Sequence, residues 1–127
     1  MTVTSIGMTS AIQGLQQALE AFRRPGVQLG NWRWGVRQRM GAVRDALVAE
    51  TGQGGEGWLA AREVGLLRER NALLGRLSAL GRQVLENQDV DEVRTELHRL
   101  LVDVSHHVQR LHDLAYDEVE LELGGSE

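Results

Sequence analysis

The sequence predicts an all-α protein, a four-helix bundle in which the last two helices form a long antiparallel hairpin. Apolar residues recur every three or four positions over most of the chain, which is the spacing of a helix face that packs on a core. The chain is rich in leucine and has only 4% aromatic residues, which favours helices over strands. Pro25 and the glycines of residues 52–57 divide the pattern into separate segments.

The front half predicts two helices. Residues 1–8 lack a strong pattern and are expected to form a mobile lead-in, after which a helix spans about residues 10–24 and ends at Pro25. A second helix, capped by Asn31, is expected to end before the connector of residues 52–57. The core positions of the two helices are Ile12, Leu15, Leu19 and Phe22, and then Trp32, Val36, Met40, Val43 and Leu47.

The back half predicts two longer helices. One extends from about Trp58 to Leu85 and the other from Asp89 to about Glu122, with residues 123–127 as a tail. The turn of residues 86–88 is short, so the two helices are expected to lie antiparallel. Asp89 is expected to cap the last helix, and Glu92 to return the hydrogen bond. The core positions of the third helix are Leu59, Leu66, Leu67, Leu73, Leu74, Leu77, Leu80 and Val84.

The last helix carries two stripes at heptad spacing. The main stripe is Val90, Val93, Leu97, Leu100, Val104, His107, Leu111 and Leu114. The second stripe is His98, Leu101, Ser105, Val108, His112, Ala115 and Val119. Two stripes indicate two packing partners. Both partners can be helices of the same chain, or one stripe can pack against a second copy or another protein.

The chain has the size of one domain, residues 1–127. It is expected to bury about two-thirds of the surface that it exposes when unfolded. It contains neither cysteine nor lysine, which excludes disulfides, thiolate chemistry, Schiff bases and a P-loop lysine. No apolar run approaches the length of about 18 residues that crosses a membrane, and no signal-peptide pattern is present, so we expect a cytoplasmic protein without membrane contact.

All four histidines lie on the last helix. They are His98, His106, His107 and His112. Two metal ligands on one helix need a separation of three or four residues, whereas these are separated by 8, 9, 14, 1, 6 and 5. We therefore expect no metal and no cofactor. The alternative is a metal- or small-ligand-binding bundle that uses Asp103 with His106, His107 or His112, with ligands shared across a dimer.

Residues 32–44, WRWGVRQRMGAVR, combine two tryptophans with four arginines. The arginines are spread around the helix and the protein has a net charge of -4, so we expect no nucleic-acid binding. Trp34 points nearly opposite Val36 and therefore lies off the core stripe, where either a partner or a second internal helix can cover it. Tryptophan with arginine is typical of interface anchors. The candidate partner-binding residues are Trp34, Arg33, Arg37, His98 and His112.

The charges are unevenly distributed along the chain. Residues 1–50 carry a net charge of +3, residues 51–88 of +1, and residues 89–127 of -8. Such a distribution fits pairing of the two ends within one bundle, or association between copies. Catalytic patterns are lacking, since Asp103 and Ser105 lie about 200° apart around a helix and no G-x-S-x-G is present. We expect no enzyme and no catalytic residues.

The segments WRWGVR (32–37) and HHVQRLHDLAYDEVELELGGSE (106–127) resemble those of a group of small, uncharacterised helical proteins from high-GC actinobacteria. The resemblance spans residues 30–127 and implies a source class, and it carries no functional residue over. From the residues themselves we predict a non-enzymatic helical interaction or regulatory module that self-associates, with a dimer as the expected form.

Overall fold

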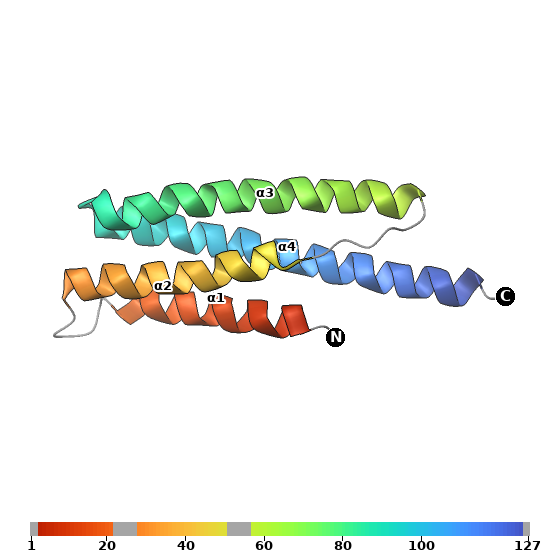
Figure 1. The fold of residues 1–127 in the computed structure, drawn as a ribbon, viewed down its shortest axis with the longest axis horizontal. Helices are drawn as coiled ribbons and strands as arrows, with labels where there is room; N and C mark the ends of the chain where they lie inside the picture. The colour runs from red at the N-terminus through yellow and green to blue at the C-terminus, as the bar shows by residue number, and fades with distance from the viewer. Residues whose placement is uncertain (1–2, 22–27, 51–56, 126–127) are drawn as a thin grey trace.

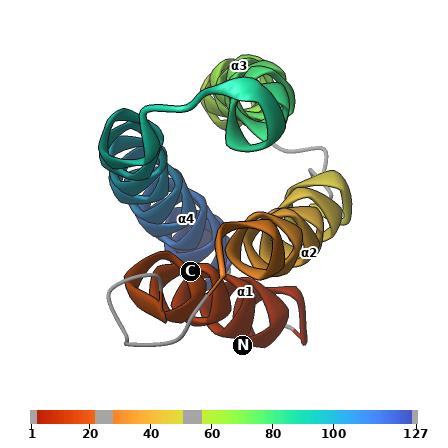
Figure 2. The same cartoon turned by 90° about the vertical axis from the view of Figure 1, so that its left-hand side faces the viewer.

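The computed structural model describes residues 3–21, 28–50 and 57–125, and it shows four α-helices packed as an antiparallel bundle (Figure 1). The helices are α1 (Val3–Ala21), α2 (Leu29–Val48), α3 (Gly57–Glu86) and α4 (Val90–Gly125). Contacts are most extensive within the α1–α2 and α3–α4 pairs, and among the neighbouring helices they are fewest between α1 and α4. Viewed from the end, the helices occupy four corners (Figure 2). The predicted four-helix bundle and its long α3–α4 hairpin are confirmed.

The first helix begins earlier than expected. α1 starts at Val3, so residues 3–8 of the expected lead-in are helical. The reason is that Met8 lies seven residues before Leu15, and both side chains are buried on the same face. The expected core position Phe22 and the expected helix end near residue 24 lie outside the described residues.

The second helix also begins earlier, and Asn31 does not cap it. α2 starts at Leu29 after Gln28, which has an extended backbone and makes no side-chain cap. The backbone N–H of Trp32 donates to the Gln28 carbonyl (3.0 Å), which places Asn31 inside the first turn. All five residues expected in the core of this helix are buried: Trp32, Val36, Met40, Val43 and Leu47.

Of the two hydrogen bonds predicted for the capping box of the last helix, one is present. The backbone N–H of Glu92 donates to Asp89 Oδ1 (3.1 Å). The N–H of Asp89, which Glu92 was expected to satisfy, donates instead to Asn87 Oδ1 (2.8 Å). The helix then continues to Gly125, so residues 123–125 of the expected tail are helical.

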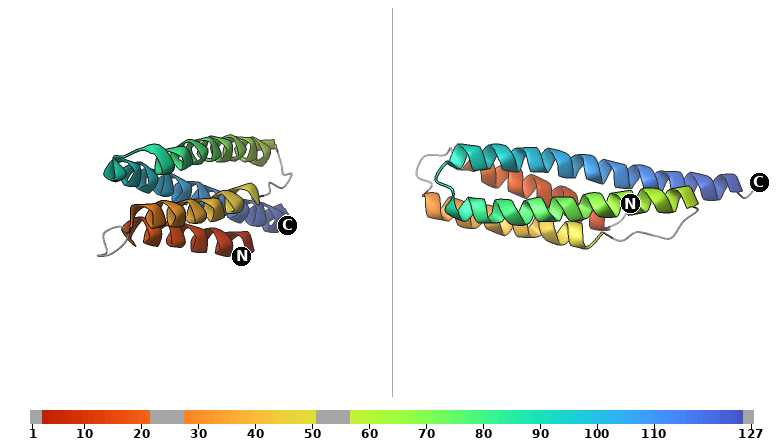
Figure 3. Two further views of the ribbon diagram at one scale, coloured as in Figure 1. Left: turned by 60° about the vertical axis from the view of Figure 1, so that its left-hand side comes forward. Right: turned by 90° about the horizontal axis from the view of Figure 1, so that it is seen from above.

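The hydrophobic core lies in the part of the bundle where all four helices run side by side. α3 and α4 extend past α1 and α2 at the end where the C-terminus lies (Figures 1 and 3). Arg70 contacts the Glu50 carbonyl, which marks the level at which α2 has ended. Leu67 lies one turn beyond that level and is 46% exposed, so its expected place in the core is wrong. The side chain of Leu59 lies outside the described residues.

The two stripes of α4 have different environments. The main stripe is buried at Val93, Leu97, Leu100, Val104, His107 and Leu114. In the second stripe, Leu101 is buried and Val108 is half-buried, whereas Ser105 and His112 are exposed. His98 contacts Glu20 of α1, so the first part of the second stripe packs on a helix of the same chain.

Candidate functional site

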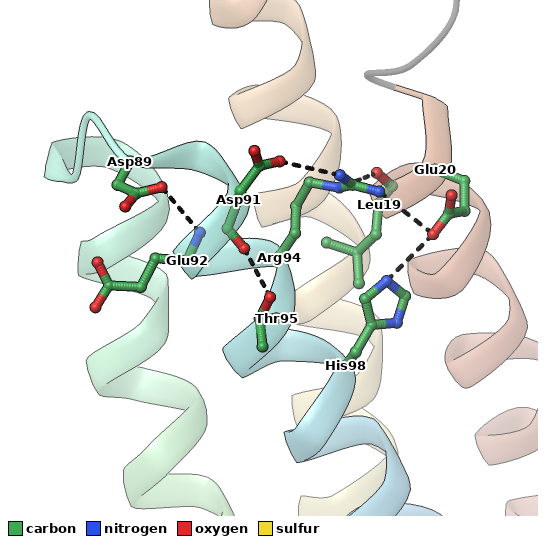
Figure 4. A network of polar contacts seen from close by, with 8 residues as sticks. All are labelled: Leu19, Glu20, Asp89, Asp91, Glu92, Arg94, Thr95 and His98. Carbon is green, nitrogen blue, oxygen red and sulfur yellow. Dashed lines mark hydrogen bonds and ion pairs between the residues drawn. The ribbon is translucent and has the colours of Figure 1, made fainter.

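Arg94 joins α4 to the end of α1. Its side chain is nearly buried, and its Nε donates to the Leu19 carbonyl (3.0 Å) in the last turn of α1 (Figure 4). Its two Nη atoms contact Glu20 Oε1 (3.4 Å) and Asp91 Oδ1 (3.3 Å). His98 Nε2 lies 3.2 Å from the same Glu20 oxygen. A buried guanidinium needs such partners, and here they join the two neighbouring helices that share the fewest contacts.

Two further arginines hold helix ends in the same way. Arg70 Nη1 donates to the Glu50 carbonyl (2.9 Å), just after α2, and Arg33 Nη2 donates to the Asn87 carbonyl (3.3 Å), just after α3. Both carbonyls lie just past the negative end of a helix dipole, where a cation is favoured. Each of the first three helices therefore ends against an arginine of another helix. Arg33, a candidate partner-binding residue, has this role inside the bundle.

His107 is fully buried between two carboxylates. Its Nε2 lies 2.8 Å from Glu50 Oε2, and its Nδ1 lies 2.6 Å from Glu69 Oε1. Arg110 Nη2 lies 2.8 Å from the other oxygen of Glu69. When both carboxyl groups are ionised, both ring nitrogens face acceptors, and only an imidazolium with two N–H groups satisfies them. We call Glu50, Glu69, His107 and Arg110 the His107 cluster.

The charges of this cluster shift two pKa values. Burial lowers the pKa of His107, but the hydrogen bonds and charges of Glu50 and Glu69 outweigh it and raise the pKa above the ordinary 6.5. Burial raises the pKa of Glu69, but the contacts with Arg110 and His107 outweigh it and bring the pKa below the ordinary 4.5. Both shifts favour the charged forms.

Charges at heptad spacing line the α3–α4 hairpin. Arg62 pairs with Asp117, and Glu69 pairs with Arg110. Arg76 pairs with Asp103, with Nη1 2.7 Å from Oδ2. Each step of seven residues along α3 matches a step of seven back along α4, and the sign of the charge alternates. This charge ladder was missed in the sequence, although its spacing and alternating signs would have revealed the register of the hairpin.

The structure does not bring Asp103, His106, His107 and His112, the residues of the alternative metal site, together. Asp103 pairs with Arg76 on α3, while His106 and His112 are exposed on α4. Within the described ranges, no group of three or more histidine or acidic residues can hold a metal ion. The carboxylates around His107 contact opposite nitrogens of the ring, so they do not converge on a common point.

No helix of the described residues covers the outer side of α2. Trp34 is 67% exposed and Val48 is 56% exposed, so the possible internal helix over Trp34 is absent from the part of the chain that the structure describes. A Cβ atom built on Gly41, midway between these two residues, would meet nothing within 4 Å. A shallow open depression lies around Gly41. We define the Trp34 face as Trp34, Arg37, Gln38, Gly41, Asp45 and Val48.

Arg37 lies at the edge of this face, next to α3. Its Nη1 passes so close to Gly81 that a Cβ there would lie 2.7 Å from it. The absence of a side chain at Gly81 therefore leaves room for the guanidinium. Within the described residues, the side chains of Arg37 and Asp45 have no hydrogen-bond or ion-pair partner.

The chain matches no protein-family model, no curated protein and no solved structure. Over the described residues, none of the four helices combines the length and the apolar character needed to cross a membrane.

Proposed function

We propose that the protein is a non-enzymatic helical interaction module of the cytoplasm, which presents the Trp34 face of α2 to another protein chain. The observation behind this proposal is the 67% exposure of Trp34 on an ordered helix. A tryptophan on a surface exposes a large apolar area to water, and interface hot spots are enriched in tryptophan and arginine. Arg37 stands beside Trp34 on the same face.

The packing of α2 supports this role. The five core residues of α2 are at most 4% exposed, so the inner side of the helix is fixed in the bundle. The orientation of its outer side is then fixed as well. A partner that binds a preorganised surface loses less conformational entropy than one that must order it.

The burial and pairing of the histidine and aspartate side chains support a non-enzymatic role. His107 is fully buried and bonded on both nitrogens, so a substrate has no access to it. Asp103 is held by Arg76, and His98 by Glu20. For the alternative of a bound metal, His106 and His112 are exposed, but no group of three or more ligands exists among the described residues.

The proposal can be tested in the cells that make the protein. A photo-crosslinking amino acid is placed at Trp34, and a matched one at Arg82, which is exposed on α3. We expect a covalent adduct with a protein chain from position 34 and none from position 82. Equal yields at both positions, or no adduct from position 34, would contradict the proposed function.

A further inference from the structure

We infer that the chain that covers the Trp34 face is a second copy of this protein, packed antiparallel about a two-fold axis at Gly41. This inference rests on the proposed function and names the partner of the same surface. The inference is based on the order of residues along the face. When a second copy of the face runs in the opposite direction, each charged residue stands opposite a residue of the other sign, and the two apolar residues stand opposite each other.

The register follows from the distances to Gly41 along the helix. Arg37 lies four residues before Gly41 and Asp45 four residues after it, while Trp34 and Val48 lie seven residues before and after. In an antiparallel pair centred on Gly41, residues at equal distances stand at the same level. Arg37 is then opposite the partner's Asp45, and Trp34 is opposite the partner's Val48. A two-fold axis makes each of these contacts twice.

The two charges of the face are not paired with each other or with any other described residue. Arg37 and Asp45 are eight residues apart on one helix, about 12 Å along its axis. They lack partners in the described part of their own molecule, so a second copy gives each charge its opposite. A parallel pair would set Arg37 against Arg37 and Asp45 against Asp45, which like-charge repulsion disfavours.

The centre of the face allows close approach. Gly41 has no side chain, and the space above it is open. Two helices that cross at paired glycines can bring their backbones close together, so that Trp34 and the partner's Val48 come into contact. The contact of one helix with another is small for a specific interface, so we expect a dimer with a Kd on the order of micromolar.

An acidic partner, such as the last turns of α4, fits this face less well. Asp45 lies near its centre and would repel an acidic segment, whereas a second copy matches Asp45 with Arg37. Because the face carries one cation and one anion, it is also poorly suited to bind nucleic acid.

Charge reversal provides a sharp test of the register. In Arg37→Asp alone, both contacts become acid against acid, and in Asp45→Arg alone, both become arginine against arginine. We expect each variant alone to raise the dimer Kd about tenfold or more. In a mixture of the two variants, both contacts are again attractive, so a heterodimer should form. Sedimentation measures the Kd, and native mass spectrometry of mass-labelled variants identifies the heterodimer.

Three substitutions complete the test. Arg82→Asp reverses an exposed charge outside the face and should leave the dimer unchanged. Gly41→Gln should separate the helices at the axis, whereas Gly75→Gln on α3 should not. Both glycines have open space around them, so the fold should tolerate either change.

The outcomes separate this inference from the proposed function. A wild-type protein that stays monomeric up to high concentration, or two charge variants that do not form a heterodimer, would overturn the self-association register. If position 34 then still crosslinks to a different protein in cells, the interaction module stands with another partner. If position 34 crosslinks to nothing, both proposals are wrong.

Discussion

Two buried cations of α4, Arg94 and His107, contact other helices at two levels of the bundle, which we call the two junctions. The two cations differ in chemistry. Arg94 lies near the start of α4, where it meets the end of α1, and His107 lies where α2 ends. Each is nearly or fully buried and each contacts two carboxylates. A guanidinium keeps its charge at any pH that a folded protein survives, whereas an imidazolium does not. The buried cation of one junction therefore keeps its charge, whereas the buried cation of the other depends on pH.

The carboxylates of the two junctions also differ in exposure. The partners of Arg94 are half-exposed or more, at 50% for Glu20 and 89% for Asp91. Of the two partners of His107, Glu69 is 30% exposed and Glu50 only 9%. Removal of the cation therefore leaves a solvated acid at one junction and a buried acid at the other. The cost of a lost cation should be larger at His107.

The largest effect is expected for His107→Ala. The substitution leaves a cavity and an unpaired, nearly buried Glu50, so it should lower the free energy of unfolding by about 3 kcal/mol or more. Urea unfolding followed by circular dichroism measures the change. The double variant His107→Leu with Glu50→Leu should recover much of the loss, because it removes the buried charge as well. A double variant no more stable than His107→Ala would contradict this account.

A smaller loss is expected for Arg94→Met. The change removes a charged hydrogen bond to the Leu19 carbonyl but keeps much of the apolar side chain, so it should lower the free energy of unfolding by about 1.5–2 kcal/mol. The exposed acids regain water and add little to this cost. The same urea titration measures it. An Arg94→Met loss larger than that of His107→Ala would reverse the order of the two junctions.

The pH dependence distinguishes the junctions directly. Because folding raises the pKa of His107, its contribution to stability is complete below the unfolded value of about 6.5 and is lost as the pH rises through the folded pKa. Because folding lowers the pKa of Glu69, its contribution is present above the unfolded value of 4.5 and is lost as the pH falls through the folded pKa.

The measurement compares the wild type with two variants from about pH 5 to about pH 9. The stability difference between the wild type and His107→Gln should shrink as the pH rises through the folded pKa of His107. The difference between the wild type and Arg94→Met should change less over the same range, because Arg94 itself stays charged. Parallel curves for all three proteins would show that folding does not raise the pKa of His107.

The elements of the fold could be predicted because helix signals are local. The five buried residues of α2 follow from their spacing alone, and the Asp89 cap follows from its sequence neighbours. The start of α1 was missed because Met8 was not counted in the stripe, although its spacing to Leu15 fits a helix. The exposure of Leu67 depends on where α2 ends, which no local pattern contains.

The His107 cluster shows why the site was harder to predict. The main-stripe position of His107 indicated burial, but its carboxylates lie 57 and 38 residues away, on the end of α2 and on α3. The nearby Asp103 was the expected carboxylate, and it pairs with Arg76 instead. Local spacing cannot show which helices meet. The charge ladder could have placed Glu69 opposite Arg110, one turn from His107, while Glu50 had no such signal.

The smallest change in the free energy of unfolding is expected for the Arg76–Asp103 pair of the charge ladder, which lies between the two junctions. Arg76 and Asp103 are 43% and 48% exposed, so their attraction is screened by water and Asp103→Asn should cost about 0.5 kcal/mol or less. Reversal of both charges, Arg76→Asp with Asp103→Arg, should restore the stability that either reversal alone removes, because the hairpin sets the two positions side by side. A double-mutant cycle by urea unfolding measures the coupling, and salt should weaken it. A coupling as large as the loss expected for Arg94→Met would contradict the expected order of the effects.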